Sequence, residues 1–317
     1  MGLSERTKKW LSKNSLQSLD GKTILVTGSN SGIGFKTAEV ALYLGARIIL
    51  ACRNKEKAYA ARTELLRDYP AGCIDVVELD LASFASIDAF VNKLKTDAVD
   101  IDVFVNNAGV FHQPGKTTSE GFELVIGTNY IGVYYLTERL IPYLTSLGHE
   151  VIYINTISMI HKIARVEYDD FYFKRNYRNL AAYARSKLCL AKYTYALAKR
   201  LNGSNMRIYM NHPGIAITPL GLNAYFEGGV PKAAKVFASI FNSPEKSSLS
   251  VSYILSHEIP AGSIVGPTRV FGGWGYPRKN HVYRKVKKGF EELIRFTECE
   301  IEKKSMKSNG NQRDYRK

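Results

Sequence analysis

Residues 27–34 read Thr-Gly-Ser-Asn-Ser-Gly-Ile-Gly, and this stretch stands between an apolar run and a helix-like segment. The run before it, Lys22-Thr-Ile-Leu-Val-Thr27, is rich in β-branched residues, which indicates a buried parallel strand. The segment after it, residues 33–44, carries apolar residues near helical spacing and stops at Gly45, as a helix with a C-terminal glycine cap does. The order of strand, glycine turn and helix predicts a turn that cradles phosphate groups.

The three glycines of this turn explain the prediction. Gly28, Gly32 and Gly34 permit backbone conformations that other residues avoid and let a pyrophosphate approach the helix N-terminus. A tight strand-to-helix turn without a ligand is the alternative. The residues expected to bind a dinucleotide here are Gly28, Ser29, Asn30, Ser31, Gly32, Ile33 and Gly34.

Strand-like and helix-like segments alternate along most of the chain, without an internal repeat. We expect strands at 23–27, 47–51, 74–78, 101–105, 150–155, 206–211 and 263–266, and helices at 33–44, 55–68, 84–96, 121–146, 181–202 and 244–256. Repeated strand–helix units imply a parallel sheet with helices on both faces. The sequence therefore predicts an α/β fold, a Rossmann-type doubly wound parallel sheet in a single domain with a small substrate lobe.

The domain prediction has three parts. Residues 1–20 read as a polar amphipathic leader, 21–275 as the Rossmann-fold domain and 276–317 as a basic helical or disordered tail, with disorder expected over 302–317. Residues 215–243 fit neither a strand nor one helix, and we expect them to form the substrate lobe.

Composition narrows the class of protein further. The 317 residues are 45% hydrophobic, with no apolar run of membrane-spanning length, no signal-peptide core and four scattered cysteines without metal spacing. Reduced thiols, no metal and a cytoplasmic location are the expectations. The net charge is +15, and residues 278–317 hold 13 Lys or Arg against 6 Asp or Glu. No zinc spacing or aromatic-interleaved basic repeat supports nucleic-acid binding, and a weak attraction to membrane surfaces stays open.

Three further segments concern the cofactor. The second strand ends at Arg53, where an acidic residue would favour NAD, and a guanidinium suits the 2′-phosphate of NADP. NADP(H) is therefore preferred. The alternative is that Arg53 is an ordinary solvent-facing arginine at a strand end, and NAD(H) stays possible. Asp80 and Leu81 end the third strand, where an adenine would lie, although Asp80 equally suits a helix N-cap. The turn after the fourth strand adds Asn107, Ala108 and Gly109.

A phenol and an ammonium stand one helical turn apart in Tyr183-Ala-Arg-Ser-Lys187. A free tyrosine, with a pKa of about 10, is a poor base near neutral pH. A positive charge on Lys187 would lower the pKa of Tyr183 toward useful acid–base chemistry. Ser158, after the fifth predicted strand, could hydrogen-bond a substrate oxygen, and Thr156 is the alternative hydroxyl.

Together these motifs resemble the short-chain dehydrogenase/reductase family over about residues 20–270. The matching positions, in the family's order, are Thr27-Gly-x-x-x-Gly-Ile-Gly34, Asn106-Asn-Ala-Gly109, Asn129, Ser158, Tyr183-x-x-x-Lys187 and Pro213-Gly214. The segments Ala51-Cys-Arg53, Ser158-x-x-His161 and Ser243-Pro-Glu245 are similar to those of retinol dehydrogenase-like reductases.

The resemblance assigns roles that the residues alone do not. It implies that Asn129 holds a water near Lys187, and that Pro213, Gly214 and Thr218 line the nicotinamide carboxamide. It also implies pairing through two long helices, hence a homo-oligomer, and a substrate entrance bordered by the insert 165–180. His161 is expected on the surface or in a loop rather than in catalysis.

The predicted function is hydride transfer between NADP(H) and a small-molecule carbonyl or alcohol substrate. The expected catalytic residues are Asn129, Ser158, Tyr183 and Lys187, with Tyr183 as acid/base. Two alternatives stay open. One is a different reaction on the same fold, such as epimerisation or enone reduction. The other is a dinucleotide-binding regulator or scaffold that does not catalyse.

Overall fold

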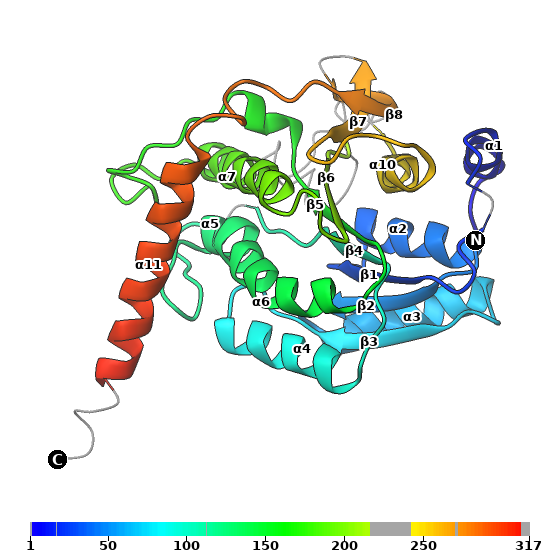
Figure 1. The fold of residues 1–317 in the computed structure, drawn as a ribbon, viewed down its shortest axis with the longest axis horizontal. Coiled ribbons are helices and arrows are strands. Elements are labelled where there is room, and N and C mark those ends of the chain that lie inside the picture. Colours follow the sequence, from blue (N-terminus) through cyan, green and yellow to red (C-terminus); the bar gives the residue numbers. More distant parts are fainter. Residues whose placement is uncertain (1, 17, 112, 216–241, 270–271, 312–317) are drawn as a thin grey trace, which may run out of the picture.

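The computed structural model describes residues 2–16, 18–111, 113–215, 242–269 and 272–311, with side chains to residue 306. Within these ranges an eight-stranded sheet crosses the molecule in the order β3-β2-β1-β4-β5-β6-β7-β8 (Figure 1). Neighbouring strands pair in parallel except β8, which is antiparallel to β7. The strands are β1 Thr23–Thr27, β2 Arg47–Cys52, β3 Ile74–Glu78, β4 Val103–Asn106, β5 Val151–Thr156, β6 Met206–Asn211, β7 Ile264–Arg269 and β8 Trp274–Asn280.

Helices cover both faces of this sheet (Figure 1). They are α1 Glu5–Lys13, α2 Gly32–Tyr43, α3 Lys55–Asp68, α4 Phe84–Thr96, α5 Leu124–Ile126, the π-helix η1 Gly127–Gly132, α6 Val133–Ser146, the 3₁₀ helix η2 Met159–Lys162, α7 Asn179–Arg200, α10 Pro244–Ser256 and α11 Phe290–Asn311. The predicted doubly wound parallel sheet is thus confirmed, and each predicted strand appears within three residues of its expected bounds.

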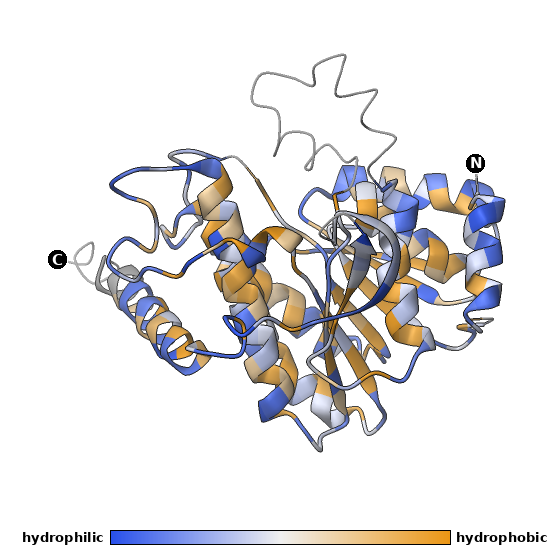
Figure 2. Ribbon diagram, turned by 90° about the horizontal axis from the view of Figure 1, so that it is seen from above, coloured by the Kyte–Doolittle hydropathy of each residue, from blue (hydrophilic) through white to orange (hydrophobic). Residues whose placement is uncertain are grey.

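Strand β1 shows how the two cores arise. Its five residues are all buried, and successive side chains point to opposite faces. Ile24 and Val26 pack with α2, α3 and α10, whereas Leu25 packs with α4, α6 and α7. Figure 2 shows the same division, with hydrophobic colour concentrated in the central strands and the helix sides that meet them.

The two ends of the chain differ from expectation. The predicted boundary at 275 falls inside β8, which adds an antiparallel strand to the sheet edge. Residues 302–311, expected to be disordered, continue α11, whose Leu293 is fully buried in the main core. At the other end α1 buries Leu11 against α2 and α10 (Figure 1). Both terminal segments therefore pack on the Rossmann domain.

The predicted helix 121–146 is also divided in the structure. It consists of α5, the π-helix η1 and α6, with Pro142 inside α6.

The cysteines are all free, as expected. Among the described residues no helix combines the length and apolar character that a membrane span requires.

Candidate active site

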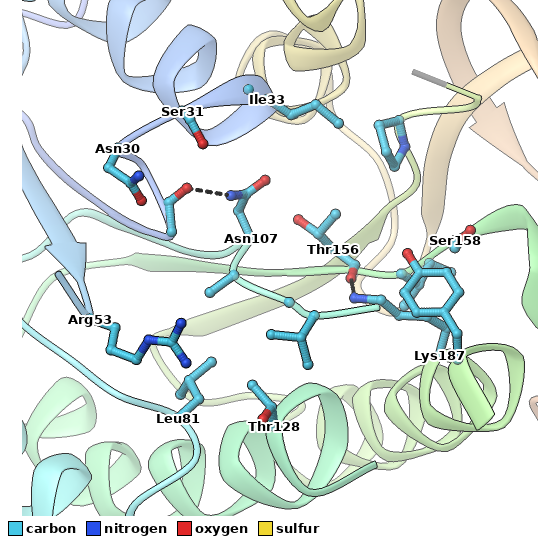
Figure 3. A pocket seen from close by; sticks show the side chains of 18 of the residues that line it. Asn30, Ser31, Ile33, Arg53, Leu81, Asn107, Thr128, Thr156, Ser158 and Lys187 are labelled. Carbon is cyan, nitrogen blue, oxygen red and sulfur yellow. Dashed lines mark hydrogen bonds between the residues drawn. The ribbon is translucent and has the colours of Figure 1, made fainter. Parts of the chain in front are cut away.

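A cavity of about 360 Å³ opens at the carboxyl ends of the central parallel strands. Figure 3 shows Asn30 and Arg53 toward one end, and Ser158 and Lys187 toward the other. Its lining comprises Gly28, Asn30, Ser31, Gly32, Ile33, Arg53, Asn54, Lys57, Leu79, Asp80, Leu81, Asn107, Ala108, Gly109, Val110, Thr128, Thr156, Ile157, Ser158, Ile160, Leu180, Tyr183, Lys187, Pro213, Gly214 and Ile215. Residues of nearly every predicted motif therefore meet around one space.

The glycine turn is shaped by close backbone approach. Gly28 has a φ of +64°, and a Cβ there would lie 2.8 Å from Ala108 Cα. A Cβ on Gly34 would lie 2.4 Å from Asn107 Nδ2. Ser31 is the N-cap of α2, and its side chain makes no capping hydrogen bond. The first main-chain amides of α2 are thus left for an anion in the cavity.

Ser29 and Gly34 are predicted cofactor residues that do not line the cavity. The Ser29 hydroxyl is buried and donates to Val26 O at 2.8 Å, so it stabilises the turn from behind. Gly34 instead leaves room for Asn107, whose Nδ2 donates to Thr27 O at 2.9 Å. The hydroxyl of Thr27 accepts from the amides of Asn107 and Ala108 at 3.0 and 2.9 Å. These hydrogen bonds connect the glycine turn after β1 to the turn after β4.

Two cations line the end of the cavity next to β2. Arg53 follows the strand, and Lys57 lies one helical turn further on, in the first turn of α3. Asp80 and Leu81 line the same cavity. The Asp80 carboxylate accepts from the Ala82 amide at 2.9 Å, whereas Ser83 is the N-cap of α4. The N-cap alternative for Asp80 is therefore wrong.

Lys187 is buried at the opposite end of the cavity. Its ammonium donates to Thr156 O at 2.8 Å and lies 5.9 Å from the centre of the Tyr183 ring. Burial lowers the pKa of Lys187 to about 8, so the group is still mainly protonated at neutral pH. The Tyr183 ring meets Phe111 edge-on at 5.2 Å, which fixes the plane of the phenol.

Both residues that carry a candidate hydroxyl line the cavity. Ser158 is the N-cap of η2, and its hydroxyl accepts from the Ile160 amide at 3.5 Å. Thr156 contributes the carbonyl that binds Lys187, and its own hydroxyl has no partner among the described residues. Because the Thr156 hydroxyl is buried, the structure favours Ser158 as the hydroxyl that meets a substrate.

Asn129 is fully buried in the π-helix η1. Its Oδ1 accepts from the Val110 amide at 2.7 Å, and its Nδ2 donates to Val110 O at 2.9 Å and to Ser186 Oγ at 3.2 Å. A Cβ on Gly109 would lie 3.1 Å from Asn129 Oδ1 and 3.6 Å from Lys187 Nζ. The side chain therefore clamps the loop beside Lys187, and its role in holding a water stays a prediction.

The last predicted segment is described in part. Pro213 and Gly214 line the cavity, and Gly214 has a φ of +77° where a Cβ would meet Gly273 O at 2.6 Å. Thr218 and most of the predicted substrate lobe, 215–243, lie outside the described residues. Leu180, at the end of the insert 165–180, lines the cavity, and the insert's place at a substrate entrance stays a prediction.

Several of the lining residues were not predicted from the sequence. Lys57 could have been predicted, because it stands four residues after Arg53 at the start of a predicted helix. Thr128 carried no signal, since its position depends on how distant segments meet, whereas Ile215 is the first residue of the predicted substrate lobe 215–243. His161 was expected on the surface or in a loop, and the structure buries it completely in the short 3₁₀ helix η2.

The donor set of the cavity fits a phosphorylated dinucleotide. An uncapped helix N-terminus and a glycine cradle suit a pyrophosphate, and Arg53 with Lys57 suits a further anionic group. No cluster of three or more potential metal ligands occurs among the described side chains. The arrangement is therefore that of a dinucleotide site joined to a tyrosine, a lysine and a serine.

Residues 22–225 match the family model described as short chain dehydrogenase, and the chain belongs to this family. Among its relatives is retinol dehydrogenase 14 of Mus musculus, 39% identical over 213 residues, or 64% of each chain. Retinol dehydrogenase 13 of Homo sapiens is 35% identical over 240 residues, covering 74% of this chain and 72% of the relative. The match to the mouse protein thus spans less than two thirds of its length.

Solved structures show the same fold. A crystal structure of an uncharacterised protein from Mycobacterium paratuberculosis has a TM-score of 0.71 and 30% identity, over 90% of this chain and 95% of the other. The 3-ketoacyl-(acyl-carrier-protein) reductase of Brucella melitensis, complexed with NADH, has a TM-score of 0.60 and 27% identity, over 78% and 96%.

Proposed function

We propose that the protein is an oxidoreductase that interconverts a carbonyl and an alcohol with NADP(H), using Tyr183 as acid/base. One observation carries this proposal. Tyr183, Ser158 and Lys187 line the same cavity as the glycine turn and Arg53. The family match and the relatives named retinol dehydrogenases support the same class of reaction.

The bound cofactor would supply or accept a hydride, and the protein's residues handle the proton. In the reducing direction the Tyr183 hydroxyl donates its proton to the oxygen that was the carbonyl. The Lys187 ammonium, fixed on Thr156 O, stabilises the phenolate that remains. Ser158 donates a hydrogen bond to the same substrate oxygen and so orients the carbonyl and steadies its developing charge.

Residues around this end indicate what the substrate carries beside its carbonyl. Val110, Ile160, Leu180 and Ile215 line the cavity with Ser158 and Tyr183. These side chains offer no hydrogen bonds, so they favour an apolar group attached to the reacting carbon. An alcohol with an apolar body, as in the retinol dehydrogenases, would fit this lining.

The preference for NADP(H) rests on two cations. Arg53 and Lys57 line the cavity after β2, where a ribose 2′-phosphate would lie. NAD(H) is the alternative, and the Brucella melitensis relative was solved with NADH. The cytoplasmic location and the homo-oligomer stay predictions of the sequence.

The decisive experiment is the Tyr183→Phe variant. We expect turnover of a carbonyl panel with NADPH to disappear, while the NADPH dissociation constant changes by no more than about twofold, because the phenol hydroxyl acts on the substrate. Ser158→Ala should lower turnover with less effect. Retained turnover in Tyr183→Phe would refute the mechanism. Tight NADPH binding by the unaltered protein without turnover of any carbonyl or alcohol would instead favour the non-catalytic alternative.

A further inference from the structure

Two buried histidines lie behind the active site and do not line its cavity. His161 is in η2, three residues after Ser158, and His212 stands between β6 and Pro213. Their exposed fractions are 0% and 1%. Each therefore belongs to a segment that the proposed mechanism uses, although neither touches the reacting groups.

Each imidazole has one nitrogen bonded and one without a partner. His161 Nδ1 lies 2.6 Å from Ser158 O. A carbonyl only accepts, so Nδ1 carries the proton and Nε2 holds a lone pair. His161 Nε2 has no hydrogen-bond partner within the described chain. This ring thus presents a buried, unused acceptor.

His212 presents the opposite group. Its Nε2 lies 3.3 Å from Asn280 Nδ2, which also donates to Gly266 O at 2.9 Å. The contact with Gly266 identifies the amide nitrogen of Asn280, so His212 Nε2 accepts and Nδ1 carries the proton. His212 Nδ1 has no partner among the residues described. The pair therefore combines one unused donor with one unused acceptor.

The two rings belong to adjacent segments. The β5–β6 pairing continues past the strand ends, where the Ile157 amide donates to Asn211 O at 2.8 Å. Lys162, next to His161, and His212 approach a common point, because a Cβ on Gly272 would lie 3.2 Å from Lys162 Nζ and 3.3 Å from His212 Cε1. The charge of His161 also acts on His212, so the two rings lie within electrostatic range of each other. Leaving a buried donor and a buried acceptor unpaired is costly.

Both rings are neutral at physiological pH. Burial, opposed in part by the bond to Ser158 O, lowers the pKa of His161 to about 4. Burial and the charge of Lys162 lower the pKa of His212 to about 3. Neutral rings keep the tautomers deduced from the hydrogen bonds, and the cationic neighbours Lys162 and Lys285 oppose any second proton.

We propose that one buried water molecule joins these histidines, accepting from His212 Nδ1–H and donating to His161 Nε2. Buried waters typically satisfy such otherwise unpaired groups. The link ties the Ser158 turn, through its carbonyl, to the segment that continues as Pro213 and Gly214. His161 and His212 are thereby positioning residues, and their effect on catalysis rests on the proposed function.

The consequence is a fixed spacing between two parts of the active site. Ser158 orients the substrate oxygen in the proposed mechanism, and Pro213 with Gly214 lines the cavity beside it. A small displacement between substrate and cofactor lowers the rate steeply. Breaking the link should therefore reduce kcat more than it weakens NADPH binding.

The direct test is a crystal structure of the full chain at a resolution that shows ordered water, together with ¹⁵N NMR of the histidine rings. We expect a water within hydrogen-bond distance of His161 Nε2 and His212 Nδ1, and both rings with the proton on Nδ1. Two results would overturn the proposal: the absence of such a water, or a Lys162 ammonium bonded directly to His161 Nε2. These readouts need no turnover, so they remain informative if the proposed function fails.

A double-mutant cycle tests the coupling. His161→Asn keeps a donor near the Nδ1 position and removes Nε2, whereas His212→Gln keeps an acceptor near Nε2 and removes the Nδ1 donor. Each single variant should lower kcat roughly two- to tenfold. The double variant should be no slower than the slower single variant, because both changes break the same bridge. If the two reductions in kcat multiply in the double variant, or if neither single variant changes kcat, the proposed water bridge is contradicted.

Discussion

Replacing Arg53 by Ala should remove much of the preference for NADPH over NADH. Arg53 and Lys57 are exposed side chains that line the same end of the cavity. A hydrogen bond between charged groups contributes about 1.5–3 kcal/mol, and exposure to solvent reduces this toward about 1 kcal/mol. Since 1.4 kcal/mol is a factor of ten, we expect a roughly five- to twentyfold weaker NADPH complex.

Binding of NADH should change by less than about twofold, because NADH lacks the 2′-phosphate that the cation would meet. Arg53→Ala together with Lys57→Ala should weaken NADPH binding further, to roughly 100-fold if the two effects add. The loss should shrink at high salt, since screening already weakens exposed charge pairs.

The assay is a fluorescence titration with NADPH and with NADH at low and high salt. Lys55→Ala is the matched control, because Lys55 lies on the same helix and pairs with Glu78 at 2.7 Å rather than lining the cavity. Equal weakening of NADPH and NADH by Arg53→Ala, or no weakening of either, would refute the assignment of Arg53 to the 2′-phosphate.

Three further predictions concern other parts of the fold. Burial lowers the pKa of Lys187 to about 8, so the rate of carbonyl reduction should fall as the pH rises through that value and the ammonium loses its proton. A kcat/KM profile that stays flat through that pH range would contradict this prediction. Gly34→Ala should abolish NADPH binding in a titration, because the new Cβ would lie 2.4 Å from Asn107 Nδ2 and displace the cofactor turn; normal affinity would refute this. Thr297→Val should lower the free energy of unfolding, measured in urea, by roughly 1–3 kcal/mol, since it leaves the buried Tyr130 hydroxyl without its partner at 2.7 Å. Thr297→Ser keeps the hydroxyl and should lower it clearly less.

The central sheet was predictable because strands such as β1 and β4 are buried on both faces and read as apolar runs. The glycine turn and the Tyr183–Lys187 pair were predictable because local spacing alone defines them. Strand β8 was not, since Trp274-Gly-Tyr-Pro-Arg-Lys-Asn280 contains glycine, proline and charge and pairs only at the sheet edge.

The burial of His161 could not be predicted for a different reason. Its neighbours in the sequence, Met159 to Lys162, form a short turn of a kind that usually lies on the surface. The turn is covered by a segment more than a hundred residues later, in which Tyr283 meets the His161 ring edge-on at 5.9 Å. Lys285 also donates to Ala164 O at 3.1 Å. Only the folded chain brings these groups together.

The C-terminal segment is therefore part of the active-site architecture rather than a tail. It holds the Ser158 turn through Lys285, and it holds the π-helix through the bond between Thr297 and Tyr130, the residue after Asn129. Thr297 donates its own proton to Leu293 O, so Tyr130 must donate to Thr297, and α11 fixes the direction of that bond. Two elements that position candidate catalytic residues thus depend on residues 281–306. Loss of this segment should disturb the active site even though none of its residues lines the cavity.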